Sequence, residues 1–214
     1  PVVPHYIYNE KAESYDPGLG IPLIVKPLSQ GSSAGITNRS VVRNPRELSD
    51  QVEYILKSCG PPVMVEPFLE GREFSIAMLG NPPRALPPIE PDHSKLPKGY
   101  EKIDSLEVKW VFEESSEVKD YLLCPAKMDN ELWSVIESVC QKTWHVLGIR
   151  DLCRIDLRCD IHGKPYVIEV NSPPGLLPPD VSMTSYFPLA ARCAGISYND
   201  LLKTIVETAY RRVS

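Results

Sequence analysis

The sequence predicts an α+β fold with largely antiparallel sheets, and two features support this prediction. Segments with strand-like and helix-like periodicity alternate unevenly, without the regular strand–helix repeat of a parallel sheet. The alternating runs 154–161 and 164–171 are joined by His162-Gly163, which we interpret as a two-residue hairpin turn. Such a turn connects antiparallel neighbours directly.

Composition limits the classes of function. The chain has 214 residues, a net charge of −5, and 43% hydrophobic and 24% charged residues, as expected for a soluble protein of one large or two small domains. No apolar run approaches the ~20 residues of a membrane helix, and the acidic balance gives no general attraction to nucleic acid. The six cysteines form no C-x-x-C pair. We therefore expect free thiols in a cytoplasmic protein without nucleic-acid or membrane partners.

We expect a first domain over residues 1–80. It opens with an extended Pro/Gly-rich stretch to Gly20, and its helix begins at Asn44, has Glu47 at the capping-box position, and ends at Gly60. The core side of this helix is expected to consist of Leu48, Val52, Ile55 and Leu56. Strands are predicted at Pro22–Pro27, Ser40–Arg43, Val63–Phe68 and Glu73–Leu79.

The second domain is expected over residues 81–214. Helices are predicted at about Asp129–Leu147 and Tyr198–Arg211, on either side of the hairpin in the sequence. Many of the 22 prolines cluster in Asn81–Pro97 and Asn171–Asp180. We interpret these two segments as long structured loops of the kind that form lids or substrate walls.

The hairpin brings acidic and amide side chains together. With a two-residue turn, Asp156 faces Glu169 and Arg154 faces Asn171 on one side of the ribbon, where opposed Cβ atoms lie only ~5 Å apart. Two carboxylates this close repel, so a proton or a cation must lie between them. Carboxylate and amide oxygens suit Mg²⁺, and phosphates usually complete its shell. The sequence therefore predicts a metal–phosphate site, and the alternative is a solvated acidic patch.

A loop of small residues, Gln30–Gly35, follows the strand that carries Lys26. Small residues let backbone N–H groups approach a phosphate closely, and serine hydroxyls add donors. The loop lacks the G-K-[ST] of a Walker A motif and precedes a strand instead of a helix. The alternatives are a plain surface turn and a solvated Lys26.

A candidate purine site lies between two predicted strands. Glu66–Leu69 offers an acceptor, a backbone edge and the aromatic Phe68, and Glu73 adds a carboxylate for a ribose. The alternative is a hairpin with a packed Phe68. Lys109 lies in Leu106–Trp110, whose alternation predicts a strand with Lys109 on the polar face.

Taken in order, these pieces resemble the D-alanine–D-alanine ligase family of the ATP-grasp superfamily. The resemblance covers Ile21–Ala209. Its motifs are Pro22–Pro27 with Gly31-Ser32-Ser33, Val65-Glu66 with Gly71–Phe74, Glu107–Lys109, Cys124–Ala126, Arg154–Asp156, Glu169–Gly175 and Phe187–Arg192. The resemblance implies an ATP-grasp fold, in which two α+β subdomains with largely antiparallel sheets enclose a nucleotide site.

The resemblance also implies roles for single residues. Arg154 and the backbone N–H of Gly175 would stabilise a tetrahedral oxyanion, and Ser33 would belong to a flexible loop on the substrate side. The nucleotide and metal sites have more members: Lys26 and Lys109 for the ATP phosphates, Glu66, Phe68, Leu69 and Glu73 for adenine and ribose, and Asp156, Glu169 and Asn171 for two Mg²⁺ ions or their substitute Mn²⁺.

The implied activity joins an amino-acid carboxylate to an amine through an acyl phosphate, with a D-alanyl-D-alanine-like product as the default. This chemistry depends on positioning and charge and needs no side-chain nucleophile. Two alternatives stay open: an ATP-grasp ligase of specialised metabolism that uses other amino acids, and a non-catalytic nucleotide-binding module or fragment.

The chain departs from the family pattern in several places. The family's N-terminal lobe, which positions the amine of the first substrate, has no counterpart here. We therefore expect poor turnover by this chain alone, and a homodimer or a separate N-terminal lobe beside the amino-acid substrates as its partners. Trp110 replaces a usual Tyr, and Gln30 a usual acidic residue. The loop between Gly175 and Pro188 is longer than the resemblance implies, and Ser185 is our candidate donor to the carboxylate of the second substrate.

Overall fold

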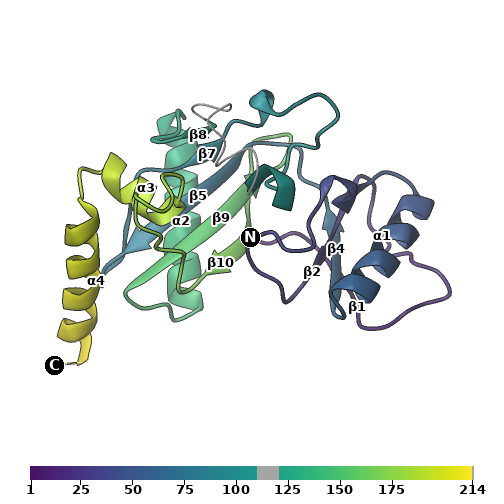
Figure 1. The fold of residues 1–214 in the computed structure, drawn as a ribbon, viewed down its shortest axis with the longest axis horizontal. Coiled ribbons are helices and arrows are strands. Elements are labelled where there is room, and N and C mark those ends of the chain that lie inside the picture. Colours follow the sequence, from purple (N-terminus) through teal and green to yellow (C-terminus); the bar gives the residue numbers. More distant parts are fainter. Residues whose placement is uncertain (110–120, 214) are drawn as a thin grey trace. The chain divides into compact units, whose positions relative to one another are not determined.

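The computed structural model describes residues 1–109 and 121–213, and these residues form two compact units (Figure 1). The first, which we call the α1 unit, comprises Val3–Glu70 and His93–Lys119. The second, the hairpin unit, comprises Pro1–Val2, Gly71–Asp92 and Asp120–Ser214. Two units were expected, with a single boundary at residue 80. In the structure, segment 71–80 belongs to the hairpin unit and segment 93–119 belongs to the α1 unit.

Long-range contacts explain this exchange. Strand β5 (Glu73–Leu79) pairs along its whole length with β9 (Leu152–Cys159), so it belongs with the hairpin. In the other direction, Asn38 Nδ2 donates to the carbonyl oxygen of Gly99 at 2.9 Å, which ties the later segment to the α1 unit. Local periodicity carries no information about either pairing.

The α1 unit is built on a four-stranded antiparallel sheet in the order β1-β4-β2-β3. Its strands are β1 (Tyr6–Tyr8), β2 (Leu23–Pro27), β3 (Val41–Val42) and β4 (Val63–Pro67). Short 3₁₀ turns lie at Asn38–Ser40 and His93–Lys95. β1 falls in the stretch expected to be only extended, and the other three strands confirm the sequence prediction within a few residues.

Helix α1 (Pro45–Ser58) covers one face of this sheet. Asn44 Oδ1 accepts the N–H of Glu47 at 3.0 Å, as predicted for the cap. The Glu47 carboxylate accepts the N–H of Arg43 at 2.7 Å, one residue earlier than in a capping box. The core side is confirmed, because three residues of the helix are buried against valines of β2 and β4: Leu48, Val52 and Ile55.

The hairpin unit is built on a second antiparallel sheet in the order β10-β9-β5-β6. It adds β6 (Arg84–Ala85) and β10 (Pro165–Asn171) to β5 and β9, and a two-stranded sheet pairs β7 (Glu90–Pro91) with β8 (Leu122–Leu123). Helix α2 (Asn130–Val146) packs on one face, against alternate residues of β5 and β9 (Figure 1).

Helices α3 (Tyr186–Cys193) and α4 (Tyr198–Val213) pack on the other face of this sheet, against Ala77 and Leu79 of β5. Helices α2 and α4 confirm the prediction, whereas α3 was not expected. Its eight residues are too few for a clear helical period, and Pro188 lies in its first turn, where a proline needs no N–H partner.

The turn of the hairpin corrects one prediction. Gly163 N–H donates to Asp160 O at 3.0 Å, and Asp160 N–H donates to Lys164 O at 3.0 Å, so the loop is Ile161–Gly163 and has three residues. Gly163 has φ +82°, the left-handed conformation that such a loop requires. The expected two-residue turn is wrong. A register shift between Val167 and Glu169 then offsets the extra loop residue.

The strand predicted at Leu106–Trp110 is not present in the described part of this segment. Leu106–Lys109 form a helical turn, in which Lys109 N–H donates to Ser105 O at 2.9 Å. The buried hydroxyl of Ser105 accepts the N–H of Val108 at 3.3 Å, so the serine caps this turn. A local cap therefore outweighs the alternation that indicated a strand. Trp110 lies outside the described residues.

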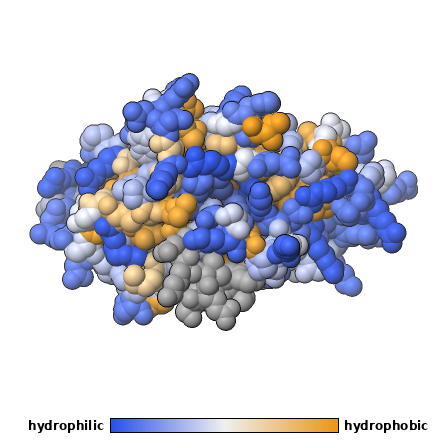
Figure 2. Space-filling view, turned by 90° about the horizontal axis from the view of Figure 1, so that it is seen from above, coloured by the Kyte–Doolittle hydropathy of each residue, from blue (hydrophilic) through white to orange (hydrophobic). Residues whose placement is uncertain are grey.

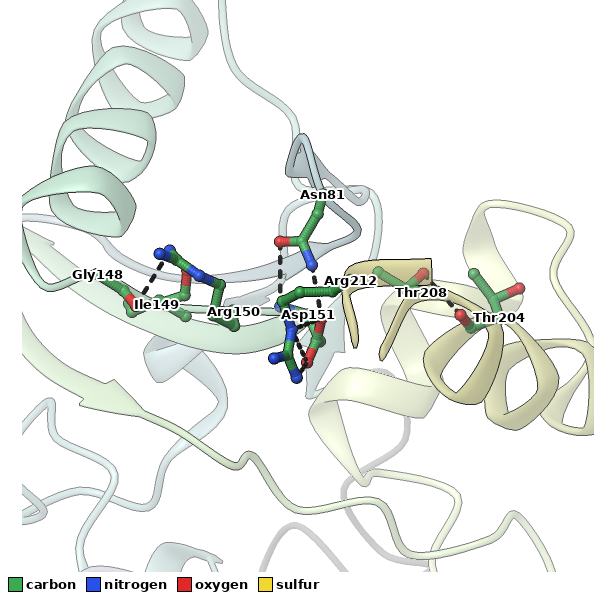
Figure 3. A network of polar contacts seen from close by, with 8 residues as sticks. All are labelled: Asn81, Gly148, Ile149, Arg150, Asp151, Thr204, Thr208 and Arg212. Atoms are coloured by element: carbon green, nitrogen blue, oxygen red, sulfur yellow. Dashed lines mark hydrogen bonds and ion pairs between the residues drawn. The ribbon is translucent and has the colours of Figure 1, made fainter. Parts of the chain in front are cut away.

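The end of α4 is fixed to the sheet by a polar network (Figure 3). Arg212 Nη2 donates to Asp151 Oδ2 at 2.8 Å, and Asn81 Nδ2 donates to Asp151 Oδ1 at 2.5 Å. The hydrogen bond from Arg212, opposed by burial and aided by Asn81, holds the pKa of Asp151 below its usual value. Three separate segments thus meet at one carboxylate.

On the face of the molecule drawn in Figure 2, hydrophilic side chains predominate and apolar ones form scattered patches. None of the helices within residues 1–109 and 121–213 is long and apolar enough to cross a bilayer.

Candidate active site

The predicted metal group lies together at the open end of β9 and β10. Glu169 pairs with Asp156, and Asn171 pairs with Arg154, as the sequence predicted. All four side chains lie on the sheet face that carries α3, because the intervening Ile155 is buried on the α2 side. The loop and the bulge therefore leave the expected register intact at the functional end.

Arg154 supplies a positive charge to one of the two carboxylates, that of Asp156. Its Nε donates to Asp156 Oδ1 at 2.8 Å, and its Nη2 donates to Asp156 Oδ2 at 2.7 Å. Both side chains are about one-tenth exposed, at 11% and 9%. Burial opposes the charge on the guanidinium, but the Asp156 carboxylate outweighs burial and raises the pKa of Arg154. Arg154 is therefore held in its charged form.

The two carboxylates have different surroundings. Asp156 is buried and also accepts from Ser75 Oγ at 2.6 Å and from Asn171 Nδ2 at 3.0 Å. The Glu169 side chain is exposed and makes no hydrogen bond to the described residues. Asp156 is thus a satisfied structural group in this state, whereas Glu169 is open to a ligand.

These residues fit a hard cation. Because Asn171 directs its NH₂ group at Asp156, its carbonyl oxygen Oδ1 is the atom left for a ligand. The set then offers two carboxylates and an amide oxygen, the donors that Mg²⁺ prefers. Within the described ranges, no cluster of three or more His, Cys, Asp or Glu side chains is arranged to hold a metal, so phosphate oxygens would have to complete the shell.

Two residues that sequence reasoning missed also contact this group. The Tyr186 ring lies under the Arg154 guanidinium, with Cζ 5.3 Å from the ring centroid, and the ring is buried. Ser75 holds Asp156 from β5. The only hint of Tyr186 in the sequence was its position directly after Ser185, a predicted site residue. Ser75 had none, because its pairing with Asp156 is long-range.

Two further predicted residues lie in the loops that follow β10. The backbone N–H of Gly175 makes no hydrogen bond to a backbone acceptor in the described part of the chain, and the residue is exposed. Ser185 is the N-terminal cap residue of α3, but its side chain caps nothing. Both groups therefore retain hydrogen-bonding capacity for a substrate.

The ribose candidate Glu73 also belongs to the hairpin unit. Its Oε2 accepts from Arg158 Nη1 at 2.6 Å, and the side chains are only 13% and 6% exposed. The two residues face each other across β5 and β9. Arg158 is a neighbour that sequence reasoning did not identify, and it fixes the carboxylate of Glu73 in one direction.

The phosphate and adenine candidates lie in the α1 unit. Lys26 of β2 and Glu66 of β4 form an ion pair at 2.5 Å, with side chains only 13% and 8% exposed. The Phe68 ring packs with Val41 and Ile103, and its N–H donates to Pro22 O, so the packed-phenylalanine alternative holds for this ring. Leu69 is half-buried, and Lys109 stands in the helical turn described above.

The serine loop has an unusual backbone. Ser32 and Ser33 have φ +57° and +59°, a left-handed conformation that costs a non-glycine residue about 1–2 kcal/mol. Ser33 Oγ donates to Asp104 O at 2.7 Å and holds the loop in this form. At Gly35 a Cβ atom would lie 2.6 Å from Pro27 Cγ, so glycine is required there. Strain of this kind gathers at functional loops.

The chain is similar to known proteins along most of its length. The family model described as "D-ala D-ala ligase C-terminus" matches residues 5–207. An uncharacterized protein of Sinorhizobium fredii is 33% identical over 207 residues, which are 96% of this chain and 57% of that protein. A D-alanine–D-alanine ligase of Pelotomaculum thermopropionicum is 32% identical over 192 residues, which are 89% of this chain and 54% of the ligase.

Solved structures show the same fold. The D-alanine–D-alanine ligase of Bacillus anthracis complexed with ATP superposes with a TM-score of 0.72 at 22% identity, over 98% of this chain and 60% of that one. The ligase from Coxiella burnetii has a TM-score of 0.68 at 21% identity, over 99% and 53%. The chain therefore spans little more than half the length of the curated relatives quoted above.

Proposed function

We propose a function from the family to which this chain belongs, the D-alanine–D-alanine ligase family. The chain forms the nucleotide-binding and catalytic part of an ATP-dependent carboxylate–amine ligase. The observation that carries this proposal is the group around β9 and β10, where Arg154, Asp156, Glu169 and Asn171 share one sheet face. The default product is a D-alanyl-D-alanine-like dipeptide.

Within this proposal, the candidate residues described above would contact ATP. Lys26 and Lys109 would bind the phosphates, and the backbone of Glu66–Leu69 would contact the adenine. Because the Phe68 ring is already packed, it would support this segment from below without stacking on the base. Glu73, oriented by Arg158, would accept the ribose hydroxyls.

Asp156, Glu169 and Asn171 would hold two Mg²⁺ ions, or Mn²⁺, which would neutralise the phosphate charge and orient the γ-phosphate. Asp156 must first release Arg154, since both of its oxygens are engaged. Arg154 would then remain over the Tyr186 ring, at the place where negative charge develops during the reaction.

The proposed reaction balances without a side-chain nucleophile. A carboxylate oxygen of the first amino acid attacks the γ-phosphorus and releases ADP, which gives an acyl phosphate. The amine of the second amino acid attacks the acyl carbon, loses a proton and expels inorganic phosphate. Arg154 and the Gly175 N–H stabilise the tetrahedral oxyanion. Ser185 would receive the second substrate's carboxylate, and Ser33 would lie on the substrate side.

A second candidate function is a ligase of specialised metabolism that joins other amino acids. The aromatic Tyr186 directly follows Ser185 and is buried with its ring against Arg154, so a bulky side chain stands next to the expected acceptor in the sequence. A partner lobe, on the same or a separate polypeptide or from a second copy, would supply the groups for the first substrate's amine.

Calorimetric titration with Mg²⁺-ATP tests nucleotide binding by the chain, and amino-acid-dependent phosphate release by the longest form of the protein tests ligation. Binding together with release by D-alanine supports the default product, and release by other amino acids alone supports the second candidate. Binding without release under any amino acid indicates a non-catalytic module. Nucleotide binding that does not depend on Mg²⁺, or no binding at all, overturns the proposal.

A further inference from the structure

Two cysteines from distant parts of the sequence meet in the hairpin unit. Cys124 follows β8, and Cys193 is the last residue of α3. Cys193 Sγ donates to the carbonyl oxygen of Cys124 at 3.3 Å. Cys124 packs in the same apolar cluster as Ala190 and Ala191 of α3, so the segment after β8 and this helix are in direct contact.

The two thiols differ in access. Cys193 is exposed, whereas Cys124 is half-buried and its Sγ donates to Pro87 O at 3.9 Å. Burial, together with the neighbouring Cys193 thiol, raises the pKa of Cys124. An oxidant in solution therefore reaches Cys193 first, and Cys124 is the protonated thiol beside it.

We propose that Cys124 and Cys193 form a reversible disulfide that clamps the C-terminal end of α3 to the segment after β8. The oxidant is a low-molecular-weight disulfide such as oxidised glutathione. This site is separate from the group around β9 and β10 and does not depend on nucleotide binding.

The oxidation proceeds by two thiol–disulfide exchanges. The Cys193 thiolate attacks one sulfur of the small disulfide, which breaks its S–S bond and releases one thiol. Cys124, once it has lost its proton, attacks the Cys193 sulfur of the mixed disulfide and expels the second thiol. The two cysteines lose two electrons in total, and one small disulfide is reduced to two thiols.

The helix gives this bond a mechanical consequence. α3 begins with Tyr186, whose ring packs against the Arg154 guanidinium, and ends with Cys193. Phe187 and Ala190 between them are fully buried. A covalent bond at the far end therefore restricts the same short helix that covers the Arg154 guanidinium.

Incubation of the full chain with oxidised glutathione, followed by peptide mapping, tests the proposal. We expect loss of two hydrogens, a peptide that links Cys124 to Cys193, reversal by dithiothreitol, and a rise of roughly 5 °C or more in the melting temperature of the oxidised protein. Cys193→Ser should abolish both the cross-link and the oxidant-dependent rise. Cys59→Ser, which changes a partly exposed thiol in the other unit, should keep both.

Three results would overturn the proposal: no intramolecular cross-link, a cross-link through another cysteine, or the same rise in melting temperature in Cys193→Ser. Because every readout is a mass or a melting temperature without nucleotide, failure here leaves the proposed ligase function untouched. Absence of Mg²⁺-ATP binding, conversely, leaves the disulfide untouched.

Discussion

Arg154 holds both carboxylate oxygens of Asp156, at 2.8 Å from Nε and 2.7 Å from Nη2, inside the group proposed to bind metal and nucleotide. In this state the guanidinium is bonded to the Asp156 carboxylate, which a metal ion would need as a ligand. The two charges thus neutralise each other until a ligand separates them.

The Asp156→Asn variant should lose about 3 kcal/mol or more of unfolding free energy in the absence of ligands. The substitution leaves the buried guanidinium of Arg154 without its counter-charge, and breaking a buried pair costs roughly 3–5 kcal/mol. Urea denaturation measures the loss. In an Arg154→Met background the same Asn substitution should cost much less; equal costs in both backgrounds would contradict the pairing.

Glu169→Gln should behave in the opposite way. Because Glu169 is exposed and unbonded among the described residues, we expect its unfolding free energy without ligand to change by no more than about 0.5 kcal/mol. Mg²⁺-dependent ATP binding, measured by calorimetry, should weaken at least tenfold. Glu131→Gln, an exposed carboxylate on α2 at the other face of the sheet, is the control and should bind normally. A strongly destabilised Glu169→Gln variant would mark this carboxylate as structural.

Arg212→Gln should lower stability at neutral pH and have little effect in acid. The pKa of Asp151 is depressed in the folded state, chiefly by its hydrogen bond with Arg212. A depressed carboxyl pKa contributes stability above the unfolded value of ~3.9, and this contribution is lost as the pH falls through the folded pKa. The difference between variant and parent, measured by urea denaturation, should therefore shrink below about pH 4. Arg211→Gln, which removes only an exposed pair with Glu207 at 3.9 Å, should show no such pH dependence.

Two glycines near the hairpin turn should respond differently to alanine. A Cβ on Gly71 would lie 2.4 Å from Asp160 O and 2.5 Å from Cys159 O, so backbone must move, at a cost of about 3 kcal/mol or more. At Gly163 the space is open, and only φ +82° opposes a side chain, which costs about 1–2 kcal/mol. Thermal denaturation of both variants ranks them, and a larger loss at Gly163 would contradict the close approach.

The sequence predicted those features that depend on local chemistry. The Asn44 cap placed the start of α1 correctly. Asp156 lies opposite Glu169 as predicted, but the two-residue turn behind that prediction is wrong, and the bulge after Val167 restores the expected register. The strand at Leu106–Trp110 was wrong, since a buried serine capped a helical turn that alternation cannot reveal.

Features that depend on contacts between distant segments could not be predicted from the sequence. The exchange of 71–80 and 93–119 between units depends on pairing across many residues. So do Ser75 beside Asp156 and Arg158 beside Glu73, which set the state of two predicted site residues. Residue type alone identified the proposed ligands, but not which of them is already occupied by the protein itself.

The bulge after Val167 and the three-residue loop Ile161–Gly163 form a compensating pair of insertions. Either one alone would rotate every later side chain of β10 to the opposite surface of the ribbon. A natural or engineered change that shortens the Ile161–Gly163 loop must therefore also delete a residue beside Ile168. Changes in length at the loop and at the bulge should be inherited together.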